Sequence, residues 1–163
     1  ATPTMKFCYW YCRSRMPAEK APESEEAFVE ILHRIWFKLY RRCDADVEDG
    51  QDRVKGSSGF EHVFVGEIRD GKVVGFHSWI QIYLQERANN VDYRGAISAA
   101  GTPLPSSDAR VLTYQLRWNG FDKYVGTSLI GVSPEFELAL YTMCFLVGGQ
   151  DNVVLLETDT GRI

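Results

Sequence analysis

Apolar side chains in the first part of the chain recur every three or four positions, the spacing of a helix with one buried face. The clearest stretch covers residues 23–42, where Ser24 suits the N-cap and Arg41 and Arg42 would lie in the last turn. We therefore expect residues 1–57 to form a helical N-terminal part.

After residue 57 the pattern changes to short runs of β-branched and aromatic residues separated by turn signals. Residues 63–65 predict a strand, the Asp70-Gly71 pair predicts a two-residue hairpin turn, and a return strand would begin at Lys72. Apolar residues alternate over 111–118, and the Asn119-Gly120 pair predicts a second hairpin. Helices are predicted over 76–90 and 133–146, and further strands over 123–132 and 153–156. Residues 58–163 are thus expected to be the β-rich part of an α+β fold, an antiparallel sheet with packed helices.

Composition and charge limit the class of protein. A chain of 163 residues is long enough for one domain, or for two small lobes around a cleft. Its 18 basic and 22 acidic residues give a net charge of −4, which argues against a broad basic face for nonspecific duplex binding but not against a local basic site. No apolar run approaches the roughly 18 residues of a membrane span.

The cysteines are too few and too scattered for a disulfide scaffold; they are Cys8, Cys12, Cys43 and Cys144. On a helix, Cys8 and Cys12 would share one face because they are four residues apart. Burial as small apolar residues is favoured, while disulfide bonding and metal ligation stay open.

Two of the three histidines, His62 and His77, bracket the Asp70-Gly71 turn. Pairing the strands outward from this turn sets Phe64 opposite His77, and residues two apart on one strand share a face of the sheet. His62 and His77 would then be diagonal neighbours, with backbones roughly 7–8 Å apart. Such a pair suits a general base and a general acid around a phosphate. A structural pair and a metal site remain alternatives, although no third ligand stands at an obvious spacing.

Glu61 and Glu67 flank the same expected strand. Alternation would place both on the face opposite His62, and six residues of extended chain would separate them by about 20 Å. We therefore do not expect them to ligate one ion together. Each would orient a neighbour, hold a cation separately or be solvated.

Several longer motifs follow one another in the chain: SGFEHVFVGE at 58–67, GFHSWIQIYL at 75–84, DYRG at 92–95, WNG at 118–120, Lys123, and IGVSPEFE at 130–137. Together they closely resemble the EndoU family of uridylate-specific endoribonucleases, in the family's order and over roughly residues 28–147. The resemblance implies an α+β fold with two lobes around a catalytic cleft.

The resemblance also implies the roles of individual residues. His62 and His77 match the family's catalytic histidines, Lys123 its catalytic lysine, and Glu61 and Glu67 acidic positions that the family uses for activity. In the family, RNA is cut at uridines by attack of the neighbouring 2′-hydroxyl on phosphorus, which leaves a 2′,3′-cyclic phosphate. By analogy, His77 would be the base, His62 the acid, and Lys123 would stabilise the charge of the transition state.

The substrate implied by the resemblance is single-stranded RNA that contains uridine. Stimulation by Mn²⁺ or Ca²⁺ is implied as well, in support of RNA binding or of an active conformation rather than of the chemistry. No organic cofactor is implied, the residues that would hold the ion are not indicated, and a monomer is favoured. Thr127 and Ser128 stand approximately where the family places hydroxyl residues near the base, and Tyr124 is a candidate for stacking on it.

Family domains are longer on the N-terminal side, and they continue past a Thr-x-Thr segment, here 158–160, into a segment that holds the uracil. The resemblance therefore implies a single, apparently truncated catalytic domain over 1–163, and it favours secretion over a nuclear or cytoplasmic location. An RNA-binding regulator or pseudo-nuclease that keeps the fold without turnover is the alternative function. A binding protein that responds to Ca²⁺ or Mn²⁺ is a third, supported by the acidic residues alone.

Overall fold

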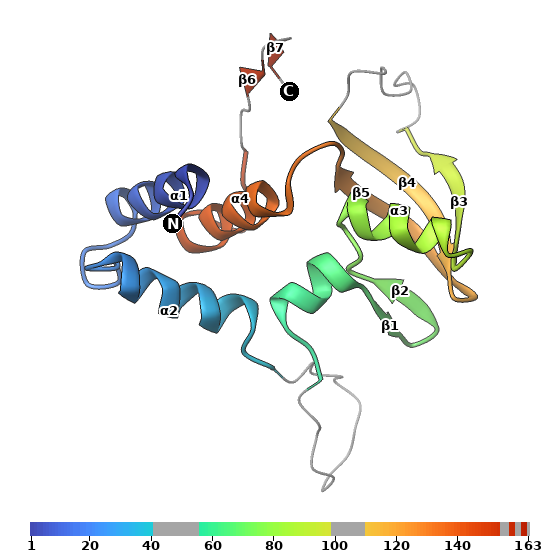
Figure 1. The fold of residues 1–163 in the computed structure, drawn as a ribbon, viewed down its shortest axis with the longest axis horizontal. Helices are drawn as coiled ribbons and strands as arrows, with labels where there is room; N and C mark the ends of the chain where they lie inside the picture. Colours follow the sequence, from blue (N-terminus) through green and yellow to red (C-terminus); the bar gives the residue numbers. More distant parts are fainter. Residues whose placement is uncertain (41–55, 99–109, 154–156, 159–160, 163) are drawn as a thin grey trace, which may run out of the picture.

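The computed structural model describes residues 1–40, 56–98, 110–153, 157–158 and 161–162. Figure 1 shows a group of helices on one side and a sheet with a further helix on the other. The helical group comprises α1 (Pro3–Arg15), α2 (Glu25–Trp36) and α4 (Pro134–Val147). Helix α3 (Trp79–Arg87) lies against the sheet. The predicted α+β fold class is confirmed.

The helical group has its own core, in which α1 packs against α4 although they stand at opposite ends of the chain. Cys8 and Cys12 lie on one face of α1, as predicted, and both are fully buried with free thiols. They pack with Tyr9 and Phe28 and with Ala139 of α4. The prediction that these two cysteines act as small buried residues is confirmed; Cys43 lies outside the described residues.

Helix α2 begins as predicted but ends early. The Ser24 hydroxyl accepts a hydrogen bond from the Ala27 backbone N–H at 3.1 Å, which makes Ser24 the N-cap. The predicted end at residue 42 is wrong, because the helix stops at Trp36 and the Tyr40 N–H donates to the Ser57 carbonyl oxygen at 2.9 Å. Residues 41 and 42 lie outside the described residues.

The sheet has the strand order β1-β2-β5-β4-β3. Its strands are β1 (Glu67–Arg69), β2 (Lys72–Val74), β3 (Val91–Ala96), β4 (Val111–Trp118) and β5 (Phe121–Leu129). All pairs are antiparallel except β2 with β5, which run parallel. Both predicted hairpins are confirmed, and Asp70 and Asn119 take the positive φ that such turns require. Strand β3 was not predicted because its side chains are mostly exposed and polar, with no alternation to reveal it.

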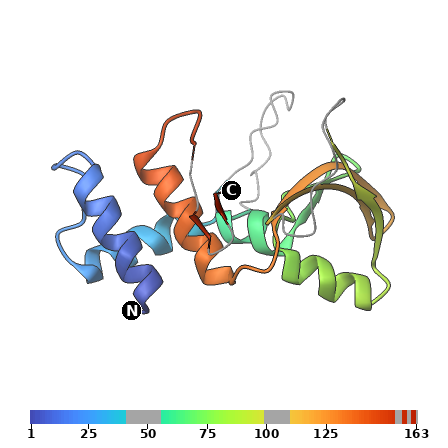
Figure 2. The same ribbon diagram turned by 90° about the horizontal axis from the view of Figure 1, so that it is seen from above.

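The prediction of a strand over residues 63–65 is wrong. This segment is the π-helix η1 (Glu61–Val65), which continues a helical turn that starts at Gly59. Its cause is aromatic packing at helical spacing: Phe60 and Phe64 lie on one side of the turn with ring centroids 5.0 Å apart, and Phe64 packs on Trp36 at 5.7 Å. Figure 2 shows η1, in blue-green, between the helices and the sheet.

The remaining segments agree with the patterns in part. Helix α4 has the predicted N-cap, with the Ser133 hydroxyl accepting from the Phe136 N–H at 3.1 Å. Helix α3 begins three residues later than predicted, because Phe76 has a φ of 61° that no helix accommodates. Val153 is not in a strand and residues 154–156 lie outside the described part; β6 (Glu157–Thr158) pairs with β7 (Gly161–Arg162). Within the described ranges, none of the helices is long and apolar enough to cross a membrane.

Candidate active site

His62 lies in the second position of η1, where it faces the start of the sheet. Its ring Nδ1 is 3.1 Å from Oε1 of Glu67, the first residue of β1. A carboxylate accepts hydrogen bonds, so this contact fixes the orientation of the imidazole and places the hydrogen on Nδ1. The prediction that Glu67 lies on the face opposite His62 is therefore wrong, since the helical turn brings the two side chains together.

His77 reaches His62 through a sharp turn of the chain. Gly75 has a φ of 62°, and a Cβ atom at this position would lie 1.9 Å from the His62 carbonyl oxygen, so only glycine fits. The Phe76 N–H donates to that carbonyl at 2.8 Å, and the His77 N–H donates to the Val63 carbonyl at 2.9 Å. The two imidazole rings end with their centroids 5.8 Å apart. The expected proximity of the histidines is confirmed, but backbone contacts with η1 create it and not a strand register.

The surroundings of His77 favour a neutral ring with one defined tautomer. Its Nδ1 is 2.8 Å from the carbonyl oxygen of Thr127 on β5, which only accepts, so Nδ1 carries the hydrogen and Nε2 carries the lone pair. Burial lowers the pKa of His77 most; the positive charges of Lys123 and His62 lower it further, and the Thr127 carbonyl acts in the opposite direction. His77 therefore presents a basic nitrogen at neutral pH.

Lys123 on β5 is buried, and its Nζ donates to the Gly75 carbonyl oxygen at 2.5 Å. Burial lowers the pKa of this ammonium group. A β-bulge between β4 and β5 turns both Lys123 and Gly126 inward. A Cβ atom on Gly126 would stand 2.6 Å from the Cε of Lys123, so the missing side chain makes room for the lysine.

The other predicted site residues occupy different surroundings. Glu61 is half-buried in η1, and its N–H donates to the Ser58 hydroxyl at 3.1 Å. Tyr124 and Thr127 are exposed on β5, whereas Ser128 is buried. Glu61 and Glu67 belong to a helical turn and the strand that follows it, so the extended segment expected between them does not exist.

No ready ion site accompanies these groups. Among the described residues, His, Cys, Asp and Glu side chains never gather in threes around one point. The His62–Glu67 pair supplies two donors, fewer than the six to eight oxygen ligands that Ca²⁺ takes. The described side chains by themselves therefore form no complete set of ligands for either ion.

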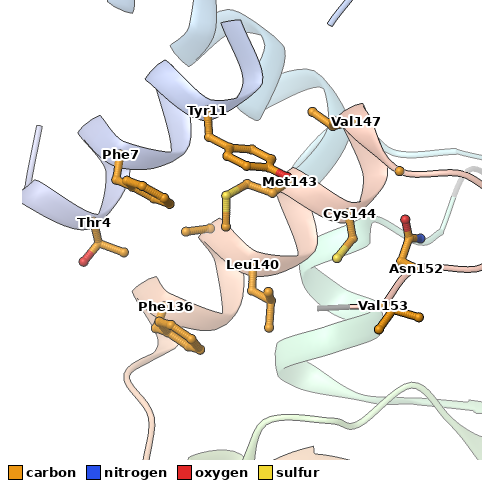
Figure 3. A pocket seen from close by; sticks show the side chains of 12 residues that line it. Thr4, Phe7, Tyr11, Phe136, Leu140, Met143, Cys144, Val147, Asn152 and Val153 are labelled. Carbon is orange, nitrogen blue, oxygen red and sulfur yellow. The ribbon is translucent and has the colours of Figure 1, made fainter. Parts of the chain in front are cut away.

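The helical group contains two apolar pockets, and one of them reaches His62. One, of about 590 Å³, lies between α2, η1 and α4; His62 and Val63 form part of its wall together with Trp36 and Phe145. The other, of about 470 Å³, lies between α1 and α4 and contains none of the predicted site residues (Figure 3). Only the first pocket adjoins the candidate catalytic groups.

Helix α4 contains a buried carboxyl group whose pKa is raised. Glu137 on α4 is fully buried, and within the described part of the chain neither of its carboxyl oxygens has a hydrogen-bond partner. Burial raises the pKa of Glu137 to about 7. The folded chain therefore holds this proton over a range in which the unfolded chain releases it.

Glu137 is expected to make the protein less stable as the pH rises from about 4.5 to about 7, by about 3 kcal/mol in total. Burial of the neutral carboxyl favours the folded chain. This contribution is fully present below the pKa of the unfolded chain, about 4.5, and is lost as the pH rises through the pKa of the folded chain, about 7. Urea unfolding at pH 5 and pH 8 measures this change. Between these pH values, the free energy of unfolding should fall much less in Glu137→Gln than in the parent chain. The matched control is Glu30→Gln, at an exposed position, which should behave like the parent. Equal falls in the parent and in Glu137→Gln would contradict the assignment.

The chain is similar to known proteins in sequence and in fold. The sequence profile of the family described as endoribonuclease XendoU matches residues 1–161. The chain is 44% identical over 153 residues to uridylate-specific endoribonuclease B of Danio rerio, covering 93% of the chain and 51% of that protein. It is 43% identical over 146 residues to poly(U)-specific endoribonuclease-B of Xenopus laevis, covering 89% of the chain and 47% of that protein.

A solved structure has the same fold. It is described as the structure of XendoU, a splicing independent snoRNA processing endoribonuclease, and it matches with a TM-score of 0.74 at 39% identity. The match covers 94% of this chain and 53% of that one. The chain thus spans about half the length of the relatives that it matches. On the family profile, the sequence identity and the shared fold, the chain belongs to the endoribonuclease XendoU family.

Proposed function

We propose that the chain carries the catalytic groups of an endoribonuclease that cleaves single-stranded RNA at uridines. The observation that supports this most strongly is the arrangement of His77, whose Nδ1 is held by the Thr127 carbonyl while its ring lies 5.8 Å from that of His62. Cleavage of RNA without water needs one group that removes a proton and another that donates one, on either side of a phosphate. The membership of the chain in the XendoU family and the names of its relatives support the same activity.

In the proposed reaction, Nε2 of His77 takes the proton of the 2′-hydroxyl, and the 2′-oxygen forms a bond to phosphorus. The bond from phosphorus to the 5′-oxygen breaks, and that oxygen takes a proton from His62. The products are a 2′,3′-cyclic phosphate and a 5′-hydroxyl, and each histidine ends with the proton state in which the other began. Glu67 holds the His62 ring through Nδ1, so Nε2 would be the nitrogen that donates this proton.

Lys123 supplies the fixed positive charge in this proposal. Its ammonium group is buried close enough to His77 to lower the pKa of that ring. Charge that builds on the phosphate oxygens in the transition state would be stabilised by a cation held in a site that excludes water. The hydrogen bond from Nζ to the Gly75 carbonyl keeps the side chain directed toward the turn that carries His77.

Recognition of the base would fall to exposed side chains on β5. Tyr124 is 60% exposed next to Lys123, and such a ring can stack on a base. Thr127 is exposed and its carbonyl contacts His77, so its hydroxyl would lie near a bound nucleotide. The buried Ser128 hydroxyl already serves the His77 backbone, which makes it a weaker candidate for contact with the base.

Mn²⁺ or Ca²⁺ is proposed to stimulate cleavage by acting on RNA binding or on the conformation of the protein. The described residues offer no three-ligand cluster for such an ion. The proposed chemistry uses only protein groups, and no step passes through the metal.

The test is a cleavage assay with a single-stranded oligonucleotide of adenosines that contains one uridine, with EDTA, Mn²⁺ or Ca²⁺. We expect one cut after the uridine, a 2′,3′-cyclic phosphate on the upstream product, and faster cleavage with the ions. The matched control carries deoxyuridine at that position, and it should stay intact because it lacks the attacking 2′-hydroxyl. Cleavage of the control would contradict the mechanism, and tight binding of the RNA without products would favour a pseudo-nuclease.

A further inference from the structure

Three consecutive backbone carbonyl groups in the turn at His77 each accept a hydrogen bond from a side chain of β4 or β5. Nζ of Lys123 donates to the Gly75 carbonyl at 2.5 Å, and the Tyr114 hydroxyl donates to the Phe76 carbonyl at 3.1 Å. The Ser128 hydroxyl donates to the carbonyl of His77 itself at 2.5 Å. All three donor side chains are buried, with Tyr114 and Ser128 each 1% exposed.

This turn needs support because its backbone is strained. Phe76 has a φ of 61°, which lies in the left-handed region. This conformation is energetically unfavourable for a residue with a bulky side chain. The position directly precedes His77, so relaxation of Phe76 would redirect the imidazole. A conformation of this kind persists only where the surroundings hold it from several sides.

The hydrogens of the two hydroxyl groups can be assigned by counting. Tyr114 and Ser128 are 2.9 Å apart, so two hydrogens serve three contacts: the Phe76 carbonyl, the His77 carbonyl and the link between the hydroxyls. Ser128 donates its hydrogen in the short bond to the His77 carbonyl. The single hydrogen of Tyr114 is then shared between the two acceptors near it, the Ser128 oxygen at 2.9 Å and the Phe76 carbonyl at 3.1 Å. Burial raises the pKa of Tyr114 to about 12, so this hydroxyl keeps its hydrogen over the working pH range.

We propose that Ser128 and Tyr114 are positioning residues which hold His77 in the orientation needed for proton transfer, with Ser128 acting directly and Tyr114 through Ser128 and Phe76. The proposal rests on the proposed catalytic role of His77. Ser128 also follows Thr127, whose carbonyl holds the His77 ring, so one short stretch of β5 secures both the backbone and the side chain of His77.

Two substitutions each remove one hydroxyl group, and the proposal predicts which of them lowers kcat more. Ser128→Ala removes the donor to His77, and we expect a fall in kcat of about 30-fold with a small change in KM. Tyr114→Phe leaves the bond from Ser128 to His77 in place, and we expect a smaller fall of about 5-fold. Ser14→Ala and Tyr11→Phe, at two solvent-accessible positions of α1, make the same chemical changes away from the site and should leave kcat unchanged.

A measurement that needs no RNA separates positioning from mere stability. NMR titration of the His77 ring should show that loss of the Ser128 hydroxyl moves its pKa upward, toward the ordinary value, because the ring becomes more exposed to water. The acid limb of the pH profile of kcat should move in the same direction, and Ser128→Thr, which keeps a hydroxyl, should restore both. Thermal unfolding of each variant checks that the chain is folded.

The outcomes are distinct. An unchanged His77 titration and a kcat within twofold of the parent in folded Ser128→Ala would overturn the proposal. If the parent chain cleaves no RNA but Ser128→Ala still shifts the His77 titration relative to the parent, the positioning of His77 is upheld and the proposed nuclease function is overturned.

Discussion

Replacing His77 with alanine is expected to lower cleavage of uridine-containing RNA by roughly 10²–10⁴-fold, the usual contribution of a positioned general base. The substitution removes the nitrogen that would take the 2′-proton, but it leaves the exposed residues of β5 in place. Binding of an oligonucleotide with deoxyuridine at the cleavage position should therefore stay within a few-fold of the parent chain. Single-turnover rates with saturating protein, measured beside this binding constant, separate chemistry from affinity.

The control for this experiment is His33→Ala, which removes an exposed imidazole on α2. It should cleave like the parent chain. The pH profile adds a second check: a base with a lowered pKa is neutral and active at more acidic pH than an ordinary histidine, so the acid limb should lie below the ordinary value of 6.5. Undiminished cutting by His77→Ala would refute the site.

Replacing Lys123 with methionine is the second change with a large expected effect. Methionine keeps most of the length of the side chain but removes the charge, and we expect the single-turnover rate to fall by roughly 10²–10³-fold. The charge of Lys123 also lowers the pKa of His77, so its removal should raise that pKa and move the acid limb toward higher pH. Rate–pH profiles of the variant and the parent test both effects together.

Lys123→Met is expected to change the stability of the protein much less than its activity. A buried ammonium group is costly to desolvate, so its replacement by an apolar side chain is expected to change Tm by only a few degrees despite the loss of activity. Lys6→Met, at an exposed position of α1, is the matched control and should affect neither property. A Lys123→Met variant that keeps both the parent rate and the parent acid limb would exclude the lysine from the site.

Much of the fold could be predicted because its signals are local. The N-caps Ser24 and Ser133 and the turns at Asp70 and Asn119 depend on residues within four positions of one another. Strand β4 could be predicted because one of its faces is buried and the other is not. Strand β3 lacked this contrast and only its pairing with β4 identifies it as a strand.

The segment around His62 shows how a short apolar run misleads. Residues 63–65 have strand-forming side chains, but they are preceded by Ser58 and, three positions later, Glu61, a helix-capping pattern that the packing of Phe60 and Phe64 reinforces. The Ser58 hydroxyl accepts from the Glu61 N–H as this motif requires. The capping pattern was available in the sequence and would have placed His62 on a helical turn.

The sequence by itself determined which residues are candidates for the chemistry, because His62, His77 and Lys123 stand in motifs long enough to identify a family. It also determined the hairpins and caps, which need only neighbouring residues. The tertiary structure alone decided how these candidates are held: the Thr127 carbonyl sets the His77 tautomer, and Lys123 and Ser128 fix the turn that carries it. These three bonds join residues 50, 48 and 51 positions apart. The burial that lowers the pKa of His77 and the strained backbone of Phe76 likewise exist only in the folded chain. Contacts of this range leave no periodic trace in the sequence, because every residue of β5 has a backbone carbonyl that can accept a hydrogen bond and many side chains could supply the two donors.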